Sequence, residues 1–284
     1  MMENLITSTD NYFIMINTLM QKTPSTLMVT FFLSLGRLLP IMVLAPFLGA
    51  RQLPAPVKIM FAISILALIF PQIIFSLKED LSINMYVIGL FLKELLTGFV
   101  LGFIIAIPFY IAQASGSLID HIRGSASLQV NDPTTQNKTG PIGILYNYVL
   151  IVVFFAIGGP FLFIDAISHS FVLLPINKLL SPMFFNVDVP FWKIIIGMIS
   201  HLMRLAVQLG APSLVGILMA EMFLGIANRL APQVQIVFLG ISLKSFVGLA
   251  LLAASWFFII NQFGKESITW LKTLNQTINL TGLH

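Results

Sequence analysis

Residues 85–112 read MYVIGLFLKELLTGFVLGFIIAIPFYIA, and this stretch decides the class of fold. A helix needs ~20 mostly apolar residues to cross the hydrocarbon core of a bilayer, and this stretch is longer than that. Its only charged residues, Lys93 and Glu94, are adjacent. The stretch therefore predicts a membrane-spanning helix that carries two ionisable side chains within its length.

The composition of the whole chain points to the same class. Of the 284 residues, 57% are hydrophobic and 9% are charged, and the mean hydropathy is +0.96. Soluble domains have roughly 25% charged residues, so this chain cannot cover a water-facing surface. The net charge of +4 comes from single Lys and Arg residues at the edges of apolar runs, as in membrane-interface anchoring. The absence of cysteine excludes disulfides, thiolate metal sites and cysteine nucleophiles.

Other apolar runs flank this stretch, and they set the expected architecture. They cover residues 27–50, 59–77, 142–176, 191–226 and 234–260. The run 142–176 is too long for one simple span, and Gly158, Gly159 and Pro160 break it. The sequence predicts an all-α membrane protein with six to seven hydrophobic, Pro- or Gly-broken helices that form hairpins. We expect one membrane domain over residues 1–260, with a polar segment at 113–141, and a polar helical tail over 261–284.

The first residues do not resemble a signal peptide, because Glu3 and Asp10 stand where a basic region is expected. The short apolar stretch 12–20 predicts a short helix that stays in the mature protein. A flexible tail is the alternative.

Nearly every predicted span carries a charge or a proline. A charged side chain at the bilayer centre costs at least ~2.5 kcal/mol. The residues concerned are Arg37, Lys93, Glu94, Arg204, Glu221 and Lys244. Either these side chains pair with one another inside a bundle, or the helices are not fully in the bilayer. Basic residues stand in nearly every connection, so two readings stay open: a weakly biased membrane topology, or helices that pack mainly on other subunits.

No motif for catalysis or metal binding is present. The sequence lacks a Walker-type phosphate loop, HExxH and GxSxG. The four histidines share no ligand spacing, and the adjacent Asp120 and His121 have no placed nucleophile. We expect no catalytic residue, no metal site and no cofactor, and therefore not an enzyme.

Residues 116–141, GSLIDHIRGSASLQVNDPTTQNKTGP, form the one long polar segment between apolar runs. Gly116 and Gly124 supply backbone freedom, and Asp132-Pro133 is a turn signal. Asp120 and Arg123 are three residues apart and can meet on one helical turn. From these residues alone, an ordinary loop outside the membrane is the simplest interpretation.

Four stretches in this order resemble one family, the export-apparatus subunit T of type III secretion systems (SctT/FliR). Together they cover about residues 33–251, and the ordered set is more specific than any one stretch. They are GRLLPIMVLAPFLGARQLPAPVKIMFAISILALIFP (36–71), KELLTGFVLGFIIAIPFYIAQASGSLIDHIRGSASLQVNDP (93–133), GGPFLFIDAISHSFVLLPI (158–176) and APSLVGILMAEMFLGIANRLAPQVQIVFLGISLKS (211–245).

The resemblance implies a non-enzymatic core subunit of an export gate in the bacterial inner membrane, multi-pass in topology and raised towards the periplasm. Family members assemble with the R subunit (SctR/FliP-like), the S subunit (SctS/FliQ-like) and the U subunit (SctU/FlhB-like). Unfolded secreted proteins pass through the centre of that hetero-oligomeric gate, and a loop of subunit T helps to plug it. The expected partners are these subunits, the substrates and membrane lipid, without nucleic acid.

The resemblance also assigns expected roles to residues. A pore plug or gating loop is expected at Gly116, Ile119, Asp120, Arg123, Gly124, Asp132 and Pro133. Buried charges and subunit packing are expected at Arg37, Pro40, Pro46, Lys58, Lys93, Glu94, Glu221, Arg229, Pro232 and Lys244. Within that set, Lys93 with Glu94, and Glu221 with Arg229 or Lys244, are candidate buried pairs. The D-x-x-R-G pattern at 120–124 and ISLKS at 241–245 favour the injectisome branch over the flagellar one.

An ion-coupled secondary transporter is the competing hypothesis. Pro46, Pro160 and Pro212 break helices, and Glu94, Asp165 and Glu221 could carry a coupling ion in such a protein. A transporter should show an internal repeat, and only LLPI recurs, at 38–41 and 173–176.

Overall fold

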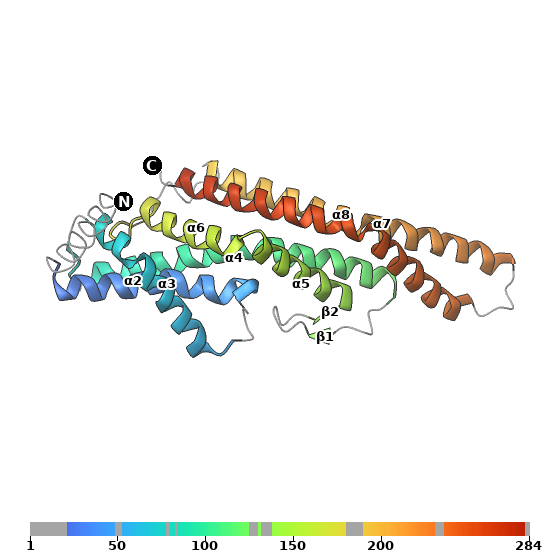
Figure 1. Ribbon diagram of the computed structural model, residues 1–284, viewed down its shortest axis with the longest axis horizontal. Helices are drawn as coiled ribbons and strands as arrows, with labels where there is room; N and C mark the ends of the chain where they lie inside the picture. Colours follow the sequence, from blue (N-terminus) through green and yellow to red (C-terminus); the bar gives the residue numbers. More distant parts are fainter. Residues whose placement is uncertain are drawn as a thin grey trace, which may run out of the picture. The chain divides into compact units, whose positions relative to one another are not determined.

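The computed structural model describes residues 22–48, 53–77, 80–82, 84–124, 130–131, 138–179, 190–230 and 236–281. These residues are almost entirely helical (Figure 1). The elements are α2 (Pro24–Leu44), η1 (Pro46–Leu48), α3 (Ala55–Ser76), α4 (Met85–Ile122), β1 (Val130–Asn131), β2 (Lys138–Thr139), α5 (Pro141–Ala156), α6 (Gly159–Leu173), α7 (Pro190–Leu230) and α8 (Ile236–Thr281). The prediction of an all-α membrane protein is confirmed.

Five of these helices, α2, α3, α4, α7 and α8, are long and apolar enough to cross a membrane. A sixth candidate span is the broken pair α5 and α6. The break falls at Gly158, whose φ of +77° is readily available only to glycine. The break predicted within residues 142–176 is therefore confirmed.

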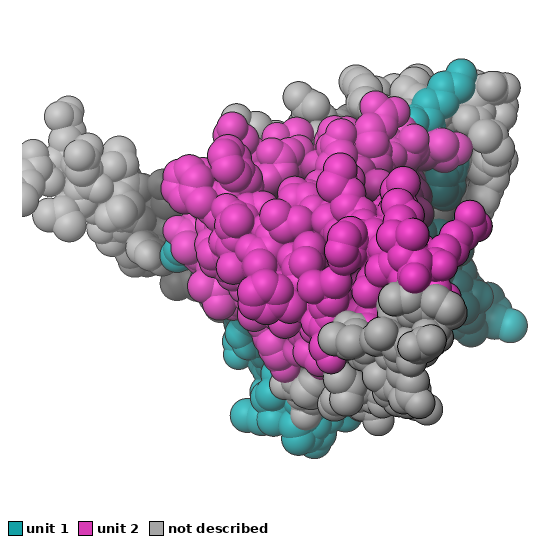
Figure 2. All heavy atoms as spheres, turned by 90° about the vertical axis from the view of Figure 1, so that its right-hand side faces the viewer, with its two compact units in different colours: residues 1–105, 161–193, 273–284 teal, residues 106–160, 194–272 magenta. Residues whose placement is uncertain are grey.

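The chain divides into two compact units (Figure 2). Unit 1 comprises residues 1–105, 161–193 and 273–284, and unit 2 comprises residues 106–160 and 194–272. Helix α4 contributes its first part to unit 1 and its last part to unit 2.

Proline and hydroxyl residues set the helix boundaries in unit 1. Thr23 caps α2, because its side chain accepts a hydrogen bond from the backbone N–H of Thr26, and Pro24 occupies the first turn. The helix ends at Leu44, since the residue before Pro46 avoids the helical region; Ala45 is extended with ψ 113°. Its buried face includes Leu38 and contacts α3.

Close helix crossings organise unit 2. A β-carbon at Gly116 of α4 would lie 2.6 Å from the α-carbon of Gly143 in α5. Helices α7 and α8 run antiparallel and side by side (Figure 1), and a β-carbon at Gly248 of α8 would lie 2.8 Å from Ile217 of α7. Glycine at these positions lets helix backbones approach one another closely.

The polar segment begins inside a helix. Helix α4 continues past the predicted end of the span at residue 112, as far as Ile122. It stops before Gly124, which has a φ of +88°. Beyond it, β1 and β2 form a two-residue antiparallel ladder, with Val130 opposite Thr139.

At the other end of the chain, α8 runs without interruption to Thr281, so the expected boundary at residue 260 falls within this helix. The short helix expected at residues 12–20 lies outside the described residues.

Large apolar side chains remain exposed on this chain. In the most apolar 18-residue window of each helix, 33% of α3, 28% of α7 and 17% of α8 is buried. Exposed residues on α7 and α8 include Met222, Phe223, Phe246 and Phe257. These faces require a non-aqueous neighbour, because burial of apolar surface from water is favourable.

Candidate functional site: a buried charge cluster and a helix junction

Arg37 and Glu94 form a buried bidentate ion pair in unit 1. The guanidinium Nε donates to Glu94 Oε2 at 2.5 Å, and Nη2 donates to Oε1 at 2.9 Å. Both side chains are fully buried. Arg37 lies on α2 and Glu94 on α4, so the pair joins two helices. A planar fork that matches a carboxylate in this way fixes orientation as well as charge.

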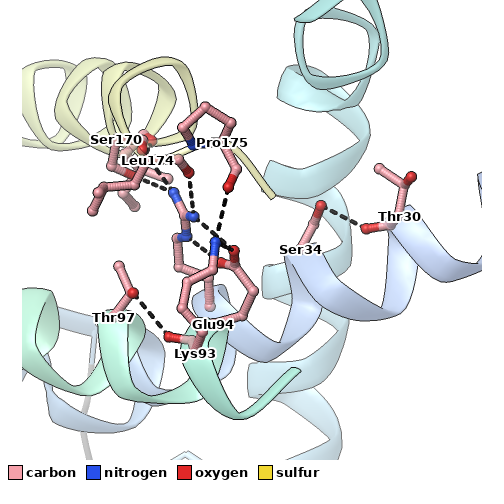
Figure 3. Close-up of polar contacts among 10 residues, drawn as sticks. Thr30, Ser34, Lys93, Glu94, Thr97, Ser170, Leu174 and Pro175 are labelled. Atoms are coloured by element: carbon pink, nitrogen blue, oxygen red, sulfur yellow. Dashed lines mark hydrogen bonds and ion pairs between the residues drawn. The ribbon is translucent and has the colours of Figure 1, made fainter. Parts of the chain in front are cut away.

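Two further interactions complete this cluster, which consists of Arg37, Lys93 and Glu94. The Lys93 ammonium also pairs with Glu94 and donates to the carbonyl oxygen of Pro175 at 2.9 Å (Figure 3). Arg37 donates to the carbonyl oxygens of Ser170 and Leu174, both at 2.7 Å.

The backbone acceptors of this cluster lie at or just after the end of α6. The last carbonyl groups of a helix have no partner within the helix and carry its partial negative charge. Two cations therefore face one carboxylate and the negative end of a helix. The ring of Phe171 adds a cation–π contact, 4.1 Å from Arg37 Cζ.

This arrangement suits a structural role. Glu94 Oε2 accepts from Arg37 and Oε1 accepts from both cations, and each cation also donates to a backbone carbonyl oxygen. Three helices, α2, α4 and α6, are thereby tied together by groups that would each be costly to bury alone. Among the described residues, no group of three or more His, Cys, Asp or Glu side chains could hold a metal ion.

Asp120 forms a second polar junction, in unit 2. One carboxylate oxygen accepts from Arg123 Nη2 at 2.7 Å and from Nε at 3.0 Å. The other accepts from the backbone N–H of Ile142 at 2.8 Å and of Gly143 at 3.2 Å. Asp120 and Arg123 are 3% and 8% exposed, so this junction lies inside the unit.

The Asp120 junction caps α5 from another helix. Gly140, the N-cap residue of α5, has no side chain that could accept from the first turn, and Pro141 follows it. A carboxylate at the positive end of a helix is stabilising. Asp120 thereby fastens the end of α4 to the start of α5, so that both ends of the segment 124–140 are held.

Glu221 of α7 and Lys244 of α8 form a third pair, at 2.7 Å. Unlike the cluster in unit 1, this pair is partly exposed, with the side chain of Glu221 54% accessible and that of Lys244 21% accessible. Arg229 lies in the last turn of α7 and is exposed.

The remaining predicted site residues occupy different environments. Pro40 lies inside α2, Pro46 begins η1 and is buried, and Lys58 is half-buried on α3. Gly116 and Ile119 are buried on α4, and Gly124 follows that helix and is exposed. Asp132, Pro133 and Pro232 lie outside the described residues.

The main-chain partners of both junctions were not predicted from the sequence. The carbonyls at the end of α6 and the amides at the start of α5 carry no side-chain signature. A weak signal existed for α5, because the Gly140-Pro141 sequence starts a helix without a capping side chain. The Phe171 ring had no signal among the many phenylalanines.

Comparison with known proteins places this architecture in a family. Residues 28–268 match the family described as "Bacterial export proteins, family 1". The chain is 30% identical to "Secretion system apparatus protein SsaT" of Salmonella typhimurium over 83% of this chain and 87% of that protein. It is 29% identical to "Yop proteins translocation protein T" of Yersinia pestis, over 79% and 85% of the two chains. It is 26% identical to "Flagellar biosynthetic protein FliR" of Bacillus subtilis, over 86% and 93%.

The match extends over α2 to α8 and therefore includes the charge cluster, the Asp120 junction and the Glu221–Lys244 pair. The apolar helices make the protein membrane-embedded. The chain belongs to the SctT/FliR family of bacterial export proteins, which are structural components of an export apparatus and not enzymes.

Proposed function

We propose that this protein is a core subunit of a type III secretion export gate in the bacterial inner membrane, where it helps to form and plug the channel for unfolded substrates. The observation that carries the proposal is the combination of the family match with the exposed apolar faces of α3, α7 and α8. A membrane subunit that leaves so much of its helices uncovered suits an assembly in which neighbours and lipid cover them.

The partners proposed are the R, S and U subunits of the same apparatus. Arg37, Lys93 and Glu94 pair with one another inside unit 1, so none of these three charges has to be buried without a partner when its outer helix faces pack on apolar neighbours. The higher identity to SsaT, 30% against 26% for FliR, supports the injectisome branch.

The plug is proposed at the end of α4 and the connection that follows it, including Gly116, Ile119, Asp120, Arg123 and Gly124. The Asp120 junction supports this proposal, because it anchors both ends of the connection while leaving the helices in place. Irregular backbone at membrane depth is tolerated where it lines water or protein.

The contacts of Glu94 weigh against the transporter hypothesis. A coupling carboxylate must be able to bind and release an ion, whereas Glu94 is buried between two cations. Asp165 and Glu221 are exposed and lie near His169 and Lys244.

The assembly itself is the decisive test. The protein would be co-expressed with the R-like and S-like subunits, purified in mild detergent and weighed intact by native mass spectrometry. We expect one stable complex that contains all three proteins. A lone monomer or dimer under every co-expression condition contradicts the proposal.

The plug is tested separately by ion leakage. Deletion of residues 116–124 in the assembled gate is expected to make membranes permeable to small ions, whereas deletion of residues 273–281 at the end of α8 is not. Because the first deletion also removes the Asp120 junction, the complex must be shown to assemble before leakage is measured. An intact complex with an unchanged permeability barrier refutes the plug.

A further inference from the structure

The α7–α8 hairpin carries charged residues at two levels. At one level, His201 Nε2 lies 3.2 Å from Glu266 Oε2, and Arg204 and Lys265 are close to them in sequence. At the other level, Glu221 pairs with Lys244. Both levels link α7 to α8, as expected for two antiparallel helices in one register.

The distance between these levels matches a bilayer. On α7, Arg204 and Glu221 are 17 positions apart, which is about 26 Å at 1.5 Å per residue. On α8, Lys244 and Lys265 are 21 positions apart, about 32 Å. The hydrocarbon core is about 30 Å thick. Residues 205–220 and 245–264 contain no charged side chain.

Exposed apolar residues fill the interval between the levels. They include Val207, Val215 and Met219 on α7, with Phe246 and Phe257 on α8. If the uncharged interval of α7 and α8 lies in the hydrocarbon core, the His201–Glu266 level lies at one membrane–water interface. The Glu221–Lys244 level then lies at the opposite interface. The ends of the helices near Asn228 and Gly240 then stand among the lipid headgroups.

A surface cavity lies at the Glu221–Lys244 level. Its volume is about 340 Å³, and it is lined by both charged residues together with Asn228, Gly225 and Gly240. A β-carbon at Gly225 would meet nothing within 4 Å, so glycine leaves open space at this position. The cavity therefore combines a carboxylate, an ammonium and a carboxamide in a small volume.

These groups retain hydrogen-bonding capacity. The ion pair joins one carboxylate oxygen to the ammonium, whereas a carboxylate has two oxygens and an ammonium has three protons. The cavity can thus bind a cation through Glu221 and an anion through Lys244 and the Asn228 amide. A ligand that carries an ammonium and an anion a few bonds apart is complementary to this cavity, since it offers each charged side chain an oppositely charged partner.

We propose that this cavity binds the headgroup of phosphatidylethanolamine, with the primary ammonium donating to Glu221 and the phosphate accepting from Lys244 and Asn228. The lipid fits for a second reason, because its acyl chains extend along the exposed apolar side chains between the two levels. A choline headgroup has no N–H to donate to Glu221. A glycerol headgroup lacks the cation. The site is independent of the gate function proposed above.

Native mass spectrometry of the whole protein tests this proposal. The protein would be released from nanodiscs that contain equal amounts of phosphatidylethanolamine, phosphatidylcholine and phosphatidylglycerol, and the retained lipid would be counted. We expect phosphatidylethanolamine to be retained preferentially, and Glu221→Gln or Lys244→Gln to lower that preference about tenfold, as for the loss of one charged hydrogen-bond partner. His201→Gln, at the other level of the same hairpin, is the matched control and should retain the lipid.

A fold control is needed because Glu221 and Lys244 also contact each other. The melting temperature of each variant in detergent separates loss of the lipid site from loss of the hairpin. A wild-type protein that shows no preference among the three lipids overturns the proposal. Equal retention in wild type and in folded Glu221→Gln does so as well. Retention that vanishes only when the R-like and S-like subunits are bound would identify a protein occupant in the gate and would also overturn it.

Discussion

Gly98 of α4 packs directly against the main chain of Arg37 in α2. A β-carbon at this position would lie 2.9 Å from the carbonyl carbon of Arg37 and 3.0 Å from its α-carbon. One turn later, a β-carbon at Gly102 would lie 3.0 Å from the α-carbon of Ile41. A close contact between α2 and α4 is thus made at the residue whose side chain forms the buried cluster, so the crossing and the cluster depend on each other.

Gly98→Ala is expected to destabilise unit 1, because the added methyl group must displace the α2 backbone. Forced overpacking of this kind typically costs about 1–3 kcal/mol. The melting temperature in detergent should fall below that of the wild type. Gly197→Ala in α7 is the control, because a β-carbon there meets nothing within 4 Å. Equal melting temperatures for the two variants would show that α2 and α4 are not in close contact at Gly98.

Glu94→Gln is expected to lower the stability of the protein more than an ordinary substitution at the surface does. Removing one member of a buried ion pair leaves an uncompensated charge and costs about 3–5 kcal/mol. Here Arg37 and Lys93 would both face a neutral amide. The double variant Arg37→Met/Glu94→Gln should recover part of the loss, since it removes one of the two cations. Both variants would be compared by thermal unfolding in the same detergent.

Lys22→Met supplies the matched control for the buried pair. Lys22 pairs with Asp80 at 3.0 Å, but the side chain of Asp80 is 49% exposed. An exposed pair contributes about 0–1 kcal/mol to stability, so the melting temperature of this variant should be close to that of the wild type. If Glu94→Gln were as mild as Lys22→Met, the buried cluster would not be stabilising the protein.

The elements that the sequence predicted are those governed by local pattern. Long apolar runs predicted the helical membrane class, because a bilayer admits few other structures. The break at Gly158 was predicted from a local pattern as well, because glycine and proline interrupt helices. The contact between Asp120 and Arg123 follows from helical spacing alone.

The unpredicted parts depend on tertiary structure. Arg37 and Glu94 are 57 residues apart in the sequence. The free-energy cost of burying a charge predicts that each has a partner, but it does not identify that partner. The carbonyls of Ser170 and Leu174 have no sequence signature at all. Helix α4 continues past residue 112 because its polar residues there are covered by unit 2, where Gln113 and Ser115 are buried. Polarity alone suggested a loop.

Asp120→Ala is expected to release the first turn of α5. Its carboxylate holds the amides of Ile142 and Gly143, and the loss of a buried partner leaves these donors unsatisfied, at about 1–3 kcal/mol. Hydrogen–deuterium exchange should accelerate at residues 142–146 and stay unchanged in α7.

Arg123→Met separates the two halves of the Asp120 junction. It removes the guanidinium but leaves the carboxylate on the α5 amides, so exchange at residues 142–146 should rise less than in Asp120→Ala. Equal acceleration in both variants would mean that Arg123, rather than the contact to α5, determines the stability of this turn.

A disulfide between α4 and α5 would show which part of the junction moves during export. A β-carbon at Gly143 would lie 2.6 Å from Ser117 Oγ, so Ser117→Cys/Gly143→Cys brings the two side chains together, and the bond is expected to form under mild oxidation once the side chain at 117 rotates. The chain has no other cysteine to compete. We expect a crosslink that reductant reverses, and export that continues in the oxidised state, because the junction already holds these two helices together.

The two single variants, Ser117→Cys and Gly143→Cys, separate the effect of the new side chains from that of the bond. Export would be measured in all three strains with and without reductant. Export that stops on oxidation of the double variant alone, and resumes on reduction, would show that α4 and α5 must separate. In that case Asp120 would be a contact that breaks on opening, and not the fixed anchor of the segment 124–140.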